Sequence, residues 1–268
     1  MPLPRPVLPM SIDEFKHMEH RLGWKHEYWN GAAQLSTQES ALTSFQRAIA
    51  PIATPVRLAA DEQLRIVRPD DEPALIELFI TAFDEAVEYA GWPDDIYRRD
   101  AEESVGAFFG KPGRHGHRDS NPARPDASFV IATPAELRAA VLVRSIRRGP
   151  ILEPIMVHPA HQRRSLATAV LIAAVNALHS VGDSILYSRC QLGNAASLAW
   201  HEQNGFQEIP NYFAANHRCH HFFWLAEHFD DIQQPDKAAE MRKLAEHWEA
   251  VVQKFEDSPE RWSSGLLD

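Results

Sequence analysis

Residues 151–167 read Ile-Leu-Glu-Pro-Ile-Met-Val-His-Pro-Ala-His-Gln-Arg-Arg-Ser-Leu-Ala, and this stretch decides the fold. Its first part, residues 151–157, is an apolar run with the length and composition of a buried strand. Pro159 ends that strand because proline has no backbone N–H to donate to a sheet. After a polar turn, residues 166–180 form a helical run that is apolar almost all round. Free N–H groups and the helix dipole make such a helix start favourable for phosphate.

Two segments of the chain resemble motifs of the GNAT acetyltransferase family. Residues 157–167 carry Val-His-Pro and then Gln-Arg-Arg-Ser-Leu-Ala, similar to the family's Gln/Arg-x-x-Gly-x-Gly/Ala loop after a strand. Residues 194–206 carry Asn-Ala-Ala-Ser, a histidine and Gly-Phe, similar to Asn-x-x-Ala/Ser-x-x-x-Tyr-x-x-x-Gly-Phe. Ser165 stands where the family usually has glycine, and His201 stands where it usually has tyrosine. A strand over residues 184–190 is predicted between the two motifs.

The resemblance implies an α/β GNAT fold, with a mixed, mostly antiparallel sheet flanked by helices. It also implies an N-acetyltransferase that moves the acetyl group of acetyl-CoA, a co-substrate, to a primary amine of a small molecule or peptide, without a metal. The strand backbone would pair with the pantetheine arm, the amides at the helix start would hold the pyrophosphate, and Asn194 would contact the arm. The residues assigned in this way to acetyl-CoA are Ile155, Met156, Val157, Gln162, Arg163, Arg164, Ser165, Leu166, Ala167, Thr168, Asn194 and Ser197.

Two residues are candidates for catalysis. Glu153 is an acidic residue in an otherwise apolar strand, so it is either a base acting through water or an exposed glutamate at the strand's edge. His201 lies seven residues after Asn194 and therefore on the same helix face. It is either the acid for the departing CoA sulfur or a packing residue beside the cofactor.

Ser165 and His201 also keep an alternative function open, a non-catalytic GNAT-like module that binds acyl-CoA as a regulator. A third possibility is an interaction protein in which the GNAT fold is a scaffold and the two terminal extensions carry the function. The identity of the acceptor cannot be predicted, because its pocket comes from variable helices and loops.

The composition narrows the class of protein. The 268 residues include 27 Lys plus Arg and 37 Asp plus Glu, so the formal net charge is −10, which argues against a nucleic-acid partner. Cys190 and Cys219 are too few for a disulfide framework and favour a reducing compartment. The proline-rich start does not resemble a signal peptide, and no apolar run of 18 residues predicts a membrane span. We therefore expect a cytoplasmic protein.

Three segments are predicted as domains: residues 1–60, 61–226 and 227–268. The first holds a helix from Ser11 to Leu22, introduced by a capping box, and a hairpin with its turn at Asn30-Gly31. Residues 1–9 are expected to be disordered, and residues 37–60 to be a connector without regular structure. Aromatic residues of the hairpin either dock it or form a lid over the acceptor; they are Trp24, Tyr28 and Trp29.

The remaining pattern completes the GNAT segment and the C-terminal extension. Strands are predicted at residues 64–68, 128–133, 139–145, from 205 and at 218–224, and helices at residues 69–88 and 93–109. His115 and His117 stand in a Gly/Pro-rich loop and lack a third ligand at a supporting spacing, so a solvated loop is favoured over a metal site. A helix over residues 236–255 carries an apolar stripe that packs on its own domain or forms a homodimer.

Overall fold

The computed structural model describes residues 7–18, 20–37, 41–53, 56–84, 86–89, 92–111 and 121–258. Its chain forms two compact units, each assembled from several segments. The larger unit contains Phe45–Arg189 and His201–Gln207, and the smaller unit contains Met1–Ser44, Cys190–Trp200 and Glu208–Asp268. The three domains proposed from the sequence stay a prediction.

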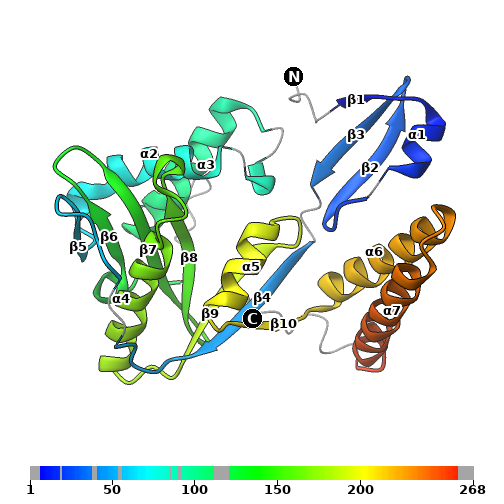
Figure 1. The fold of residues 1–268 in the computed structure, drawn as a ribbon. Coiled ribbons are helices and arrows are strands. Elements are labelled where there is room, and N and C mark those ends of the chain that lie inside the picture. The colour runs from blue at the N-terminus through cyan, green and yellow to red at the C-terminus, as the bar shows by residue number, and fades with distance from the viewer. Residues whose placement is uncertain are drawn as a thin grey trace. The chain divides into compact units, whose positions relative to one another are not determined.

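The larger sheet is mixed and mostly antiparallel, as predicted. Its strand order is β10-β4-β9-β8-β7-β6-β5 (Figure 1). Consecutive strands from β5 to β8 pair antiparallel, and β9 pairs parallel with β8. The strands are β4 (Leu42–Ala48), β5 (Gln63–Ile66), β6 (Phe129–Ala132), β7 (Leu137–Ile146), β8 (Gly149–Val157), β9 (Ile185–Gln191) and β10 (Gln207–Ile209).

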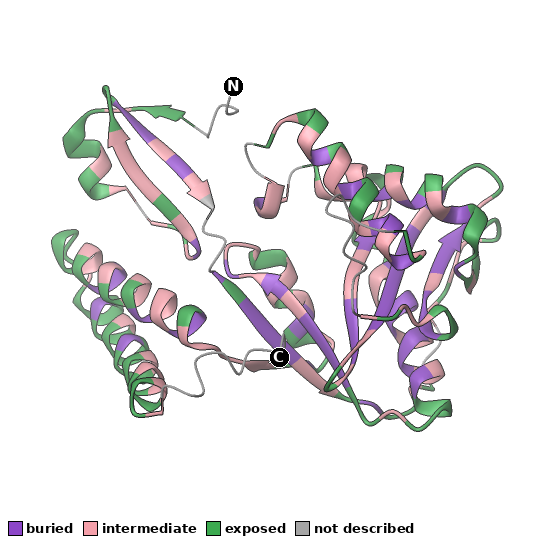
Figure 2. Cartoon of the chain, turned by 180° about the vertical axis from the view of Figure 1, so that it is seen from behind, coloured by how far each residue is buried: buried purple, intermediate pink, exposed green. Residues whose placement is uncertain are grey.

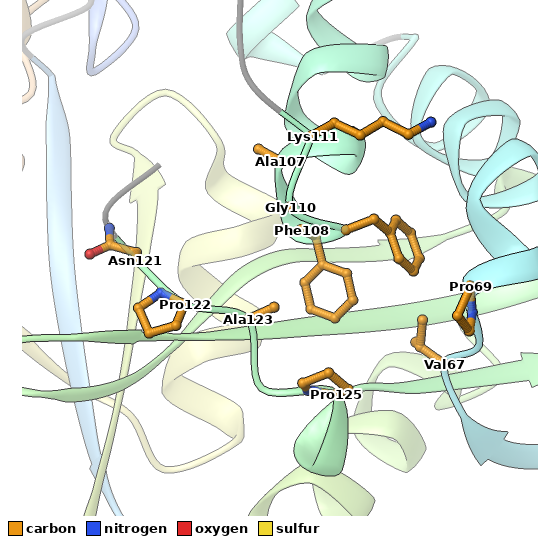
Figure 3. A pocket seen from close by; sticks show the side chains of 11 residues that line it. Val67, Pro69, Ala107, Phe108, Gly110, Lys111, Asn121, Pro122, Ala123 and Pro125 are labelled. Carbon is orange, nitrogen blue, oxygen red and sulfur yellow. The ribbon is translucent and has the colours of Figure 1, made fainter. Parts of the chain in front are cut away.

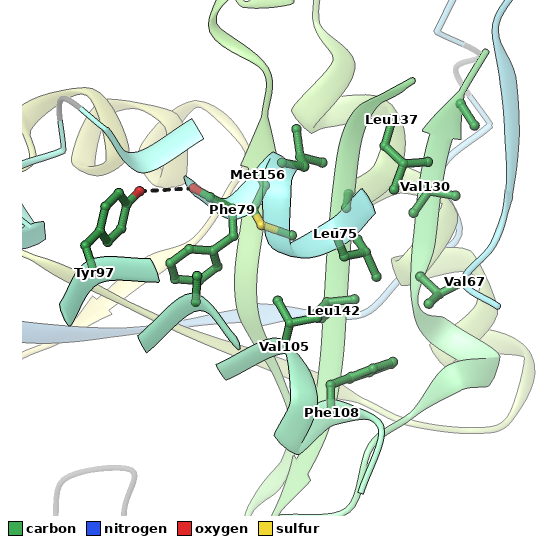
Figure 4. Packing of buried hydrophobic residues seen from close by; sticks show 14 residues of the cluster. Val67, Leu75, Phe79, Tyr97, Val105, Phe108, Val130, Leu137, Leu142 and Met156 are labelled. Carbon is green, nitrogen blue, oxygen red and sulfur yellow. Dashed lines mark hydrogen bonds between the residues drawn. The ribbon is translucent and has the colours of Figure 1, made fainter. Parts of the chain in front are cut away.

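Helices cover both faces of β7 in the larger unit. On one face, Ala140 and Leu142 belong to a buried cluster with residues of α2 (Glu72–Phe83) and α3 (Asp94–Phe108), as Figure 4 shows. On the other face, α4 (Leu166–Ser180) packs against β7. This double coverage explains why β7 is buried almost throughout and why Figure 2 draws it largely purple. Short 3-10 turns occupy Pro69–Asp71, Val87–Tyr89, Pro125–Ala127 and Pro159–His161.

The smaller unit contains a three-stranded sheet and two long helices. The predicted capping box starts α1 (Ile12–His17), and the predicted turn at Asn30-Gly31 joins β2 (Trp24–Trp29) to β3 (Ala32–Thr37). A third strand, β1 (Val7–Pro9), pairs with β3, so the N-terminal element is a small sheet rather than a helix and hairpin alone. The other helices are α5 (Ala195–Gln203), whose last residues belong to the larger unit, α6 (Tyr212–Asp231) and α7 (Pro235–Glu256).

The stripe predicted on the C-terminal helix packs against α6. The guanidinium carbon of Arg218 in α6 lies over the ring of Trp248 in α7, 4.9 Å from the ring centroid. Phe255 of α7 contacts Tyr212 of α6 edge-on, with ring centroids 6.5 Å apart. Leu244 stays 36% exposed. Packing within the unit therefore covers much of the stripe, and a homodimer stays a prediction.

Four expectations about regular structure are wrong. Residues 218–224 are helical and lie inside α6, where Asn211 caps the helix start by accepting a hydrogen bond from the Ala214 N–H at 2.8 Å. Residues 42–48 form β4 instead of a connector, and residues 7–9 form β1 instead of a disordered segment. Helix α1 ends at His17, five residues earlier than expected.

Imidazole and indole rings form a stack in the smaller unit. His26 stacks on His20 with ring centroids 4.2 Å apart, and His20 stacks on Trp224 of α6 at 4.0 Å. Trp224 then stacks on His228 at 5.1 Å. Trp24 and His221 line a neighbouring cavity of about 460 Å³. The rings thus connect the N-terminal segment to α6.

Candidate functional site

Strands β8 and β9 pair over only a short stretch. β9 is recorded as the partner of β8 at residues 151–152, opposite residues 187–188. β8 continues to Val157 and keeps its antiparallel pairing with β7 to that point. Residues 155–157 therefore have a β7 partner on one edge, whereas the β7–β8 register shifts at residues 153–154. On the other edge, residues 153–157 have no β9 partner in the described structure. Such an open edge can bind an extended group by backbone hydrogen bonds.

The side chains at the end of β8 alternate between the two faces of the sheet. Met156 is 1% exposed and lies in the cluster under α2 and α3 (Figure 4). Ile155 and Val157 are half-buried on the opposite face. The three residues predicted to meet the pantetheine arm are thus anchored by Met156 in the core.

The loop between β8 and α4 has two residues in the left-handed region. Arg163 has φ +59° and Ser165 has φ +61°. The first backbone bond of α4 runs from the Ala169 N–H to the Ser165 carbonyl at 2.9 Å, and Ser165 makes no side-chain cap. The N–H groups of residues 166–168 come before that bond and are the usual unsatisfied donors of a helix start. The left-handed φ at Ser165 would suit glycine, the residue of the resembled motif at this position.

The two arginines of this loop have different surroundings. Arg164 Nη2 lies 3.0 Å from Glu62 Oε1, and its Nη1 lies 3.3 Å from His161 Nδ1. Arg163 is exposed, and among the described residues the structure records no ion pair for it. The sequence predicted the same role for both. In the structure, only Arg163 presents an uncompensated charge.

Glu153 lies where β8 and β9 stop pairing. It forms an ion pair with Arg189, the next residue of β9 after the paired stretch. The Glu153 side chain is 42% exposed. The carboxylate is therefore accessible and held in place, and a role as base stays a prediction.

His201 is enclosed by its neighbours. Its side chain is 1% exposed, and its Nε2 lies 2.8 Å from Ser188 Oγ. The ring stacks on Phe45 at 4.3 Å and meets Phe206 edge-on at 5.1 Å. This enclosure favours the packing interpretation, and the role of His201 as an acid stays a prediction.

Asn194 caps helix α5. Its Oδ1 accepts a hydrogen bond from the Ser197 N–H at 2.9 Å, and its carbonyl accepts one from Leu198 at 3.0 Å. Both Asn194 and Ser197 belong to the smaller unit, whereas the loop from Gln162 to Thr168 belongs to the larger unit. Their contact with a pantetheine arm stays a prediction.

The larger unit also contains a cavity. It has a volume of about 410 Å³ and lies at the end of α3, lined mainly by apolar side chains that include Val67, Phe108 and Pro122 (Figure 3). None of the predicted site residues lines it. Among the described residues, no three His, Cys, Asp or Glu side chains are placed to hold a metal ion. His115 and His117 lie outside the described residues.

Three charged residues of the site region were missed by sequence reasoning. Glu62 pairs with Arg164 and with Arg138, and Arg189 pairs with Glu153. They stand outside both motifs, and pairing of charges so distant in sequence cannot be inferred without the fold. Glu62 in particular precedes β5 by one residue, a position that alone predicts only a solvated turn.

Among the described residues, no helix is both long and apolar enough to cross a membrane. Comparison with protein families matches residues 85–206 to the acetyltransferase (GNAT) family. No curated protein matches the chain.

Several solved structures resemble the chain at low identity. The ribosomal-protein-S18-alanine N-acetyltransferase from Escherichia coli is 20% identical, with 56% of this chain and 79% of that chain covered and a TM-score of 0.41. The PaiA N-acetyltransferase from Thermoplasma acidophilum, solved with coenzyme A, is 14% identical, with coverage of 55% and 89% and a TM-score of 0.44. A GNAT family acetyltransferase from Brucella melitensis, solved with acetyl-CoA, is 14% identical, with coverage of 55% and 86% and a TM-score of 0.39.

Likenesses this distant carry no argument about acceptor or partner. The family match rests instead on residues 85–206, which include β8, the loop with its two left-handed residues, α4 and the Asn194 motif. These residues match the GNAT acetyltransferase family.

Proposed function

We propose that this protein transfers the acetyl group of acetyl-CoA to a primary amine of a small molecule or peptide. The observation that carries the proposal is the open edge of β8 at residues 153–157, followed directly by the loop and the start of α4. An extended arm and a pyrophosphate require these two features side by side.

The residues present suit an anionic cofactor. Residues 158–169 include two arginines and no acidic side chain. The N–H groups at the start of α4 and the exposed Arg163 would bind the pyrophosphate, and the backbone of residues 155–157 would bind the pantetheine arm. Asn194 and Ser197 are kept as proposed contacts of the arm.

Acetyl transfer to an amine has three chemical requirements: the amine loses a proton, the thioester carbonyl is polarised, and the thiolate leaves. A backbone N–H near Val157 would polarise the carbonyl. Glu153 would accept the amine proton through water, with Arg189 fixing the orientation of its carboxylate. His201 is the candidate acid for the sulfur.

Binding and turnover are tested separately. Calorimetry with acetyl-CoA should give a stoichiometric complex, and free-thiol release with a panel of amines should reveal the acceptor class. Absence of both heat and thiol release would refute the proposal.

Glu153→Gln tests the base. We expect kcat to fall by about 100- to 10,000-fold, the usual loss of a general acid or base, while acetyl-CoA affinity stays close to that of the wild type. Glu202→Gln, an exposed charge removal on α5, is the matched control and should keep wild-type kcat. A Glu153→Gln enzyme with wild-type kcat between about pH 6 and 9 would reduce Glu153 to a structural partner of Arg189.

A second candidate function is acyl-CoA binding without turnover. The burial of His201 favours it, because a 1% exposed ring has little access to a bound thioester. Under this alternative, calorimetry detects acetyl-CoA, but no amine in the panel releases thiol. His201→Phe decides whether the ring matters for turnover: loss of kcat with unchanged affinity supports the acid, and unchanged kcat supports packing.

A further inference from the structure

Glu62 lies just before β5, outside the residues that match the family, and its side chain is fully buried. Both carboxylate oxygens are used. Oε1 accepts hydrogen bonds from Arg138 Nη1 at 2.8 Å and from Arg164 Nη2 at 3.0 Å, and Oε2 accepts one from the Ala59 N–H at 2.7 Å. A buried carboxylate with this set of donors is fixed in position.

The charge of Glu62 is maintained by these partners. Burial by itself would raise the pKa of the carboxyl, but the hydrogen bonds from Ala59 and Arg138 and the nearby charge of Arg164 hold the pKa below its usual range. The carboxylate therefore stays ionised at neutral pH. It compensates the charge of Arg164, the second arginine of the loop from Gln162 to Thr168, called the phosphate-binding loop below because of the proposed function.

The same loop is held at a second point. His161 Nε2 lies 2.9 Å from Glu136 Oε1, and Glu136 also pairs with Arg138 at 3.1 Å. Arg138 thus links the two carboxylates that hold His161 and Arg164. These contacts lie on either side of Arg163, which itself has a left-handed φ and an unpaired side chain among the described residues.

We propose that Glu62 is a positioning residue for the phosphate-binding loop: it holds Arg164 away from the cofactor and leaves Arg163 as the side chain that meets the phosphates. This inference rests on the proposed function. It assigns different roles to two neighbouring arginines that the motif treats alike. Arg164 fixes the loop, so that the N–H groups of α4 face the pyrophosphate before it binds.

The test is the salt dependence of coenzyme A binding, measured by calorimetry at several ionic strengths. Arg163→Gln should weaken binding about tenfold and flatten its salt dependence, because a direct charge-assisted contact is lost. The double variant Glu62→Gln/Arg164→Gln changes no net charge. It should bind more weakly than the wild type yet keep the wild-type salt dependence, because it removes only positioning.

Glu62→Gln alone should make binding more salt-dependent, since the released Arg164 can then reach the phosphates. Asp61→Asn is its matched control. It removes the same charge one residue away, from a carboxylate that pairs with Arg138 but is not recorded in contact with Arg164, so its salt dependence should change less. If Glu62→Gln does not fold, Arg164→Gln is measured instead, because this loop side chain is 40% exposed. It should keep the wild-type salt dependence, since Arg164 does not meet the phosphates.

Two results would overturn the inference. If the double variant loses as much salt dependence as Arg163→Gln, then Arg164 contacts phosphate directly. If Glu62→Gln and Asp61→Asn behave alike, Glu62 acts only through its charge. A wild-type protein that does not bind coenzyme A would instead overturn the proposed function, and coupling between Glu62 and Arg164 in thermal unfolding would then mark the pair as purely structural.

Discussion

Each of the two units of this chain is stabilised internally by a different kind of side chain. The larger unit has an aliphatic core in which large residues such as Leu75, Leu142 and Met156 are almost completely buried (Figure 4). In the smaller unit, the buried residues of α6 and α7 are mostly alanines, namely Ala214, Ala215, Ala226, Ala238 and Ala245. Because an alanine side chain buries little apolar area, aromatic and imidazole rings supply much of the remaining buried area in this unit. There, imidazoles and indoles stack between the N-terminal segment and α6.

The difference matters because aliphatic burial does not titrate, whereas an imidazole does. Burial lowers the pKa of His26 and of His221 to about 4, helped in both by the positive charge that His20 would carry. A stack of neutral rings is stable only while the rings stay neutral. The larger unit should therefore tolerate acid better than the smaller one.

The largest effect is expected from the aliphatic core. Leu142→Ala truncates a fully buried side chain of β7 in the cluster that also contains residues of α2 and α3. It should lower the free energy of unfolding by about 2–5 kcal/mol. Urea denaturation followed by circular dichroism measures it. Leu64→Ala on β5 is the control, because Leu64 is 37% exposed and leaves no cavity. Equal losses in the two variants would mean that the aliphatic cluster is not the main support of the larger unit.

Acidification should destabilise the smaller unit first. In the unfolded chain a histidine binds its proton near pH 6.5, whereas folded His26 and His221 do so near pH 4. As the pH falls below about 6.5, the unfolded state gains protons first. Stability of this unit should therefore decrease from about pH 6.5 down to pH 4 and level off below it. Charged or titratable groups around the stack are Arg21, Arg218, Glu227 and His228.

Tryptophan fluorescence can follow this transition in one unit. Of the seven tryptophans, Trp92 alone belongs to the larger unit. As the pH is lowered, the midpoint of thermal unfolding measured by tryptophan fluorescence should fall before the midpoint measured by far-ultraviolet circular dichroism of the whole chain. His26→Phe keeps a stacking ring and should reduce the acid sensitivity, whereas His179→Phe, on the exposed face of α4, should not. Identical acid profiles for both variants would contradict the role of the stack.

Motif spacing and apolar periodicity were sufficient to predict the centre of the larger unit. Strand β8, the turn at Pro159 and helix α4 follow from local sequence, since each has its own start and stop signal. Hairpin β2–β3 was predictable for the same reason, because Asn30-Gly31 specifies its turn.

Features that depend on distant partners were not predictable. Residues 42–48 lack a clear strand pattern. They form β4 because they pair with β9 on one side and β10 on the other. Residues 218–224 have the aromatic content of a strand, yet packing against α7 makes them helical. Within the site, the different roles of Arg163 and Arg164 depend on Glu62, which is about 100 residues earlier in the chain.

The smallest effect compares one left-handed residue from each unit. Ser165 has φ +61° in the larger unit, and Asn30 has φ +51° in the smaller one. A left-handed residue with a Cβ costs about 1–2 kcal/mol, and the added freedom of glycine in the unfolded chain cancels about 0.4–1 kcal/mol of any relief. Ser165→Gly should therefore raise the free energy of unfolding by about 1 kcal/mol or less. Asn30→Gly should change it little, because asparagine tolerates this conformation.

Ser165→Ala is the control for the serine variant. It keeps the Cβ and removes only a hydroxyl that makes no cap to α4, so it should give no gain. Differential scanning calorimetry of the three variants at pH 7.5, above the range in which the acid effect is expected, separates backbone relief from the acid effect. If Ser165→Gly is no more stable than Ser165→Ala, the left-handed turn before α4 is not a source of strain, and the glycine of the resembled motif would serve the close approach of phosphate instead.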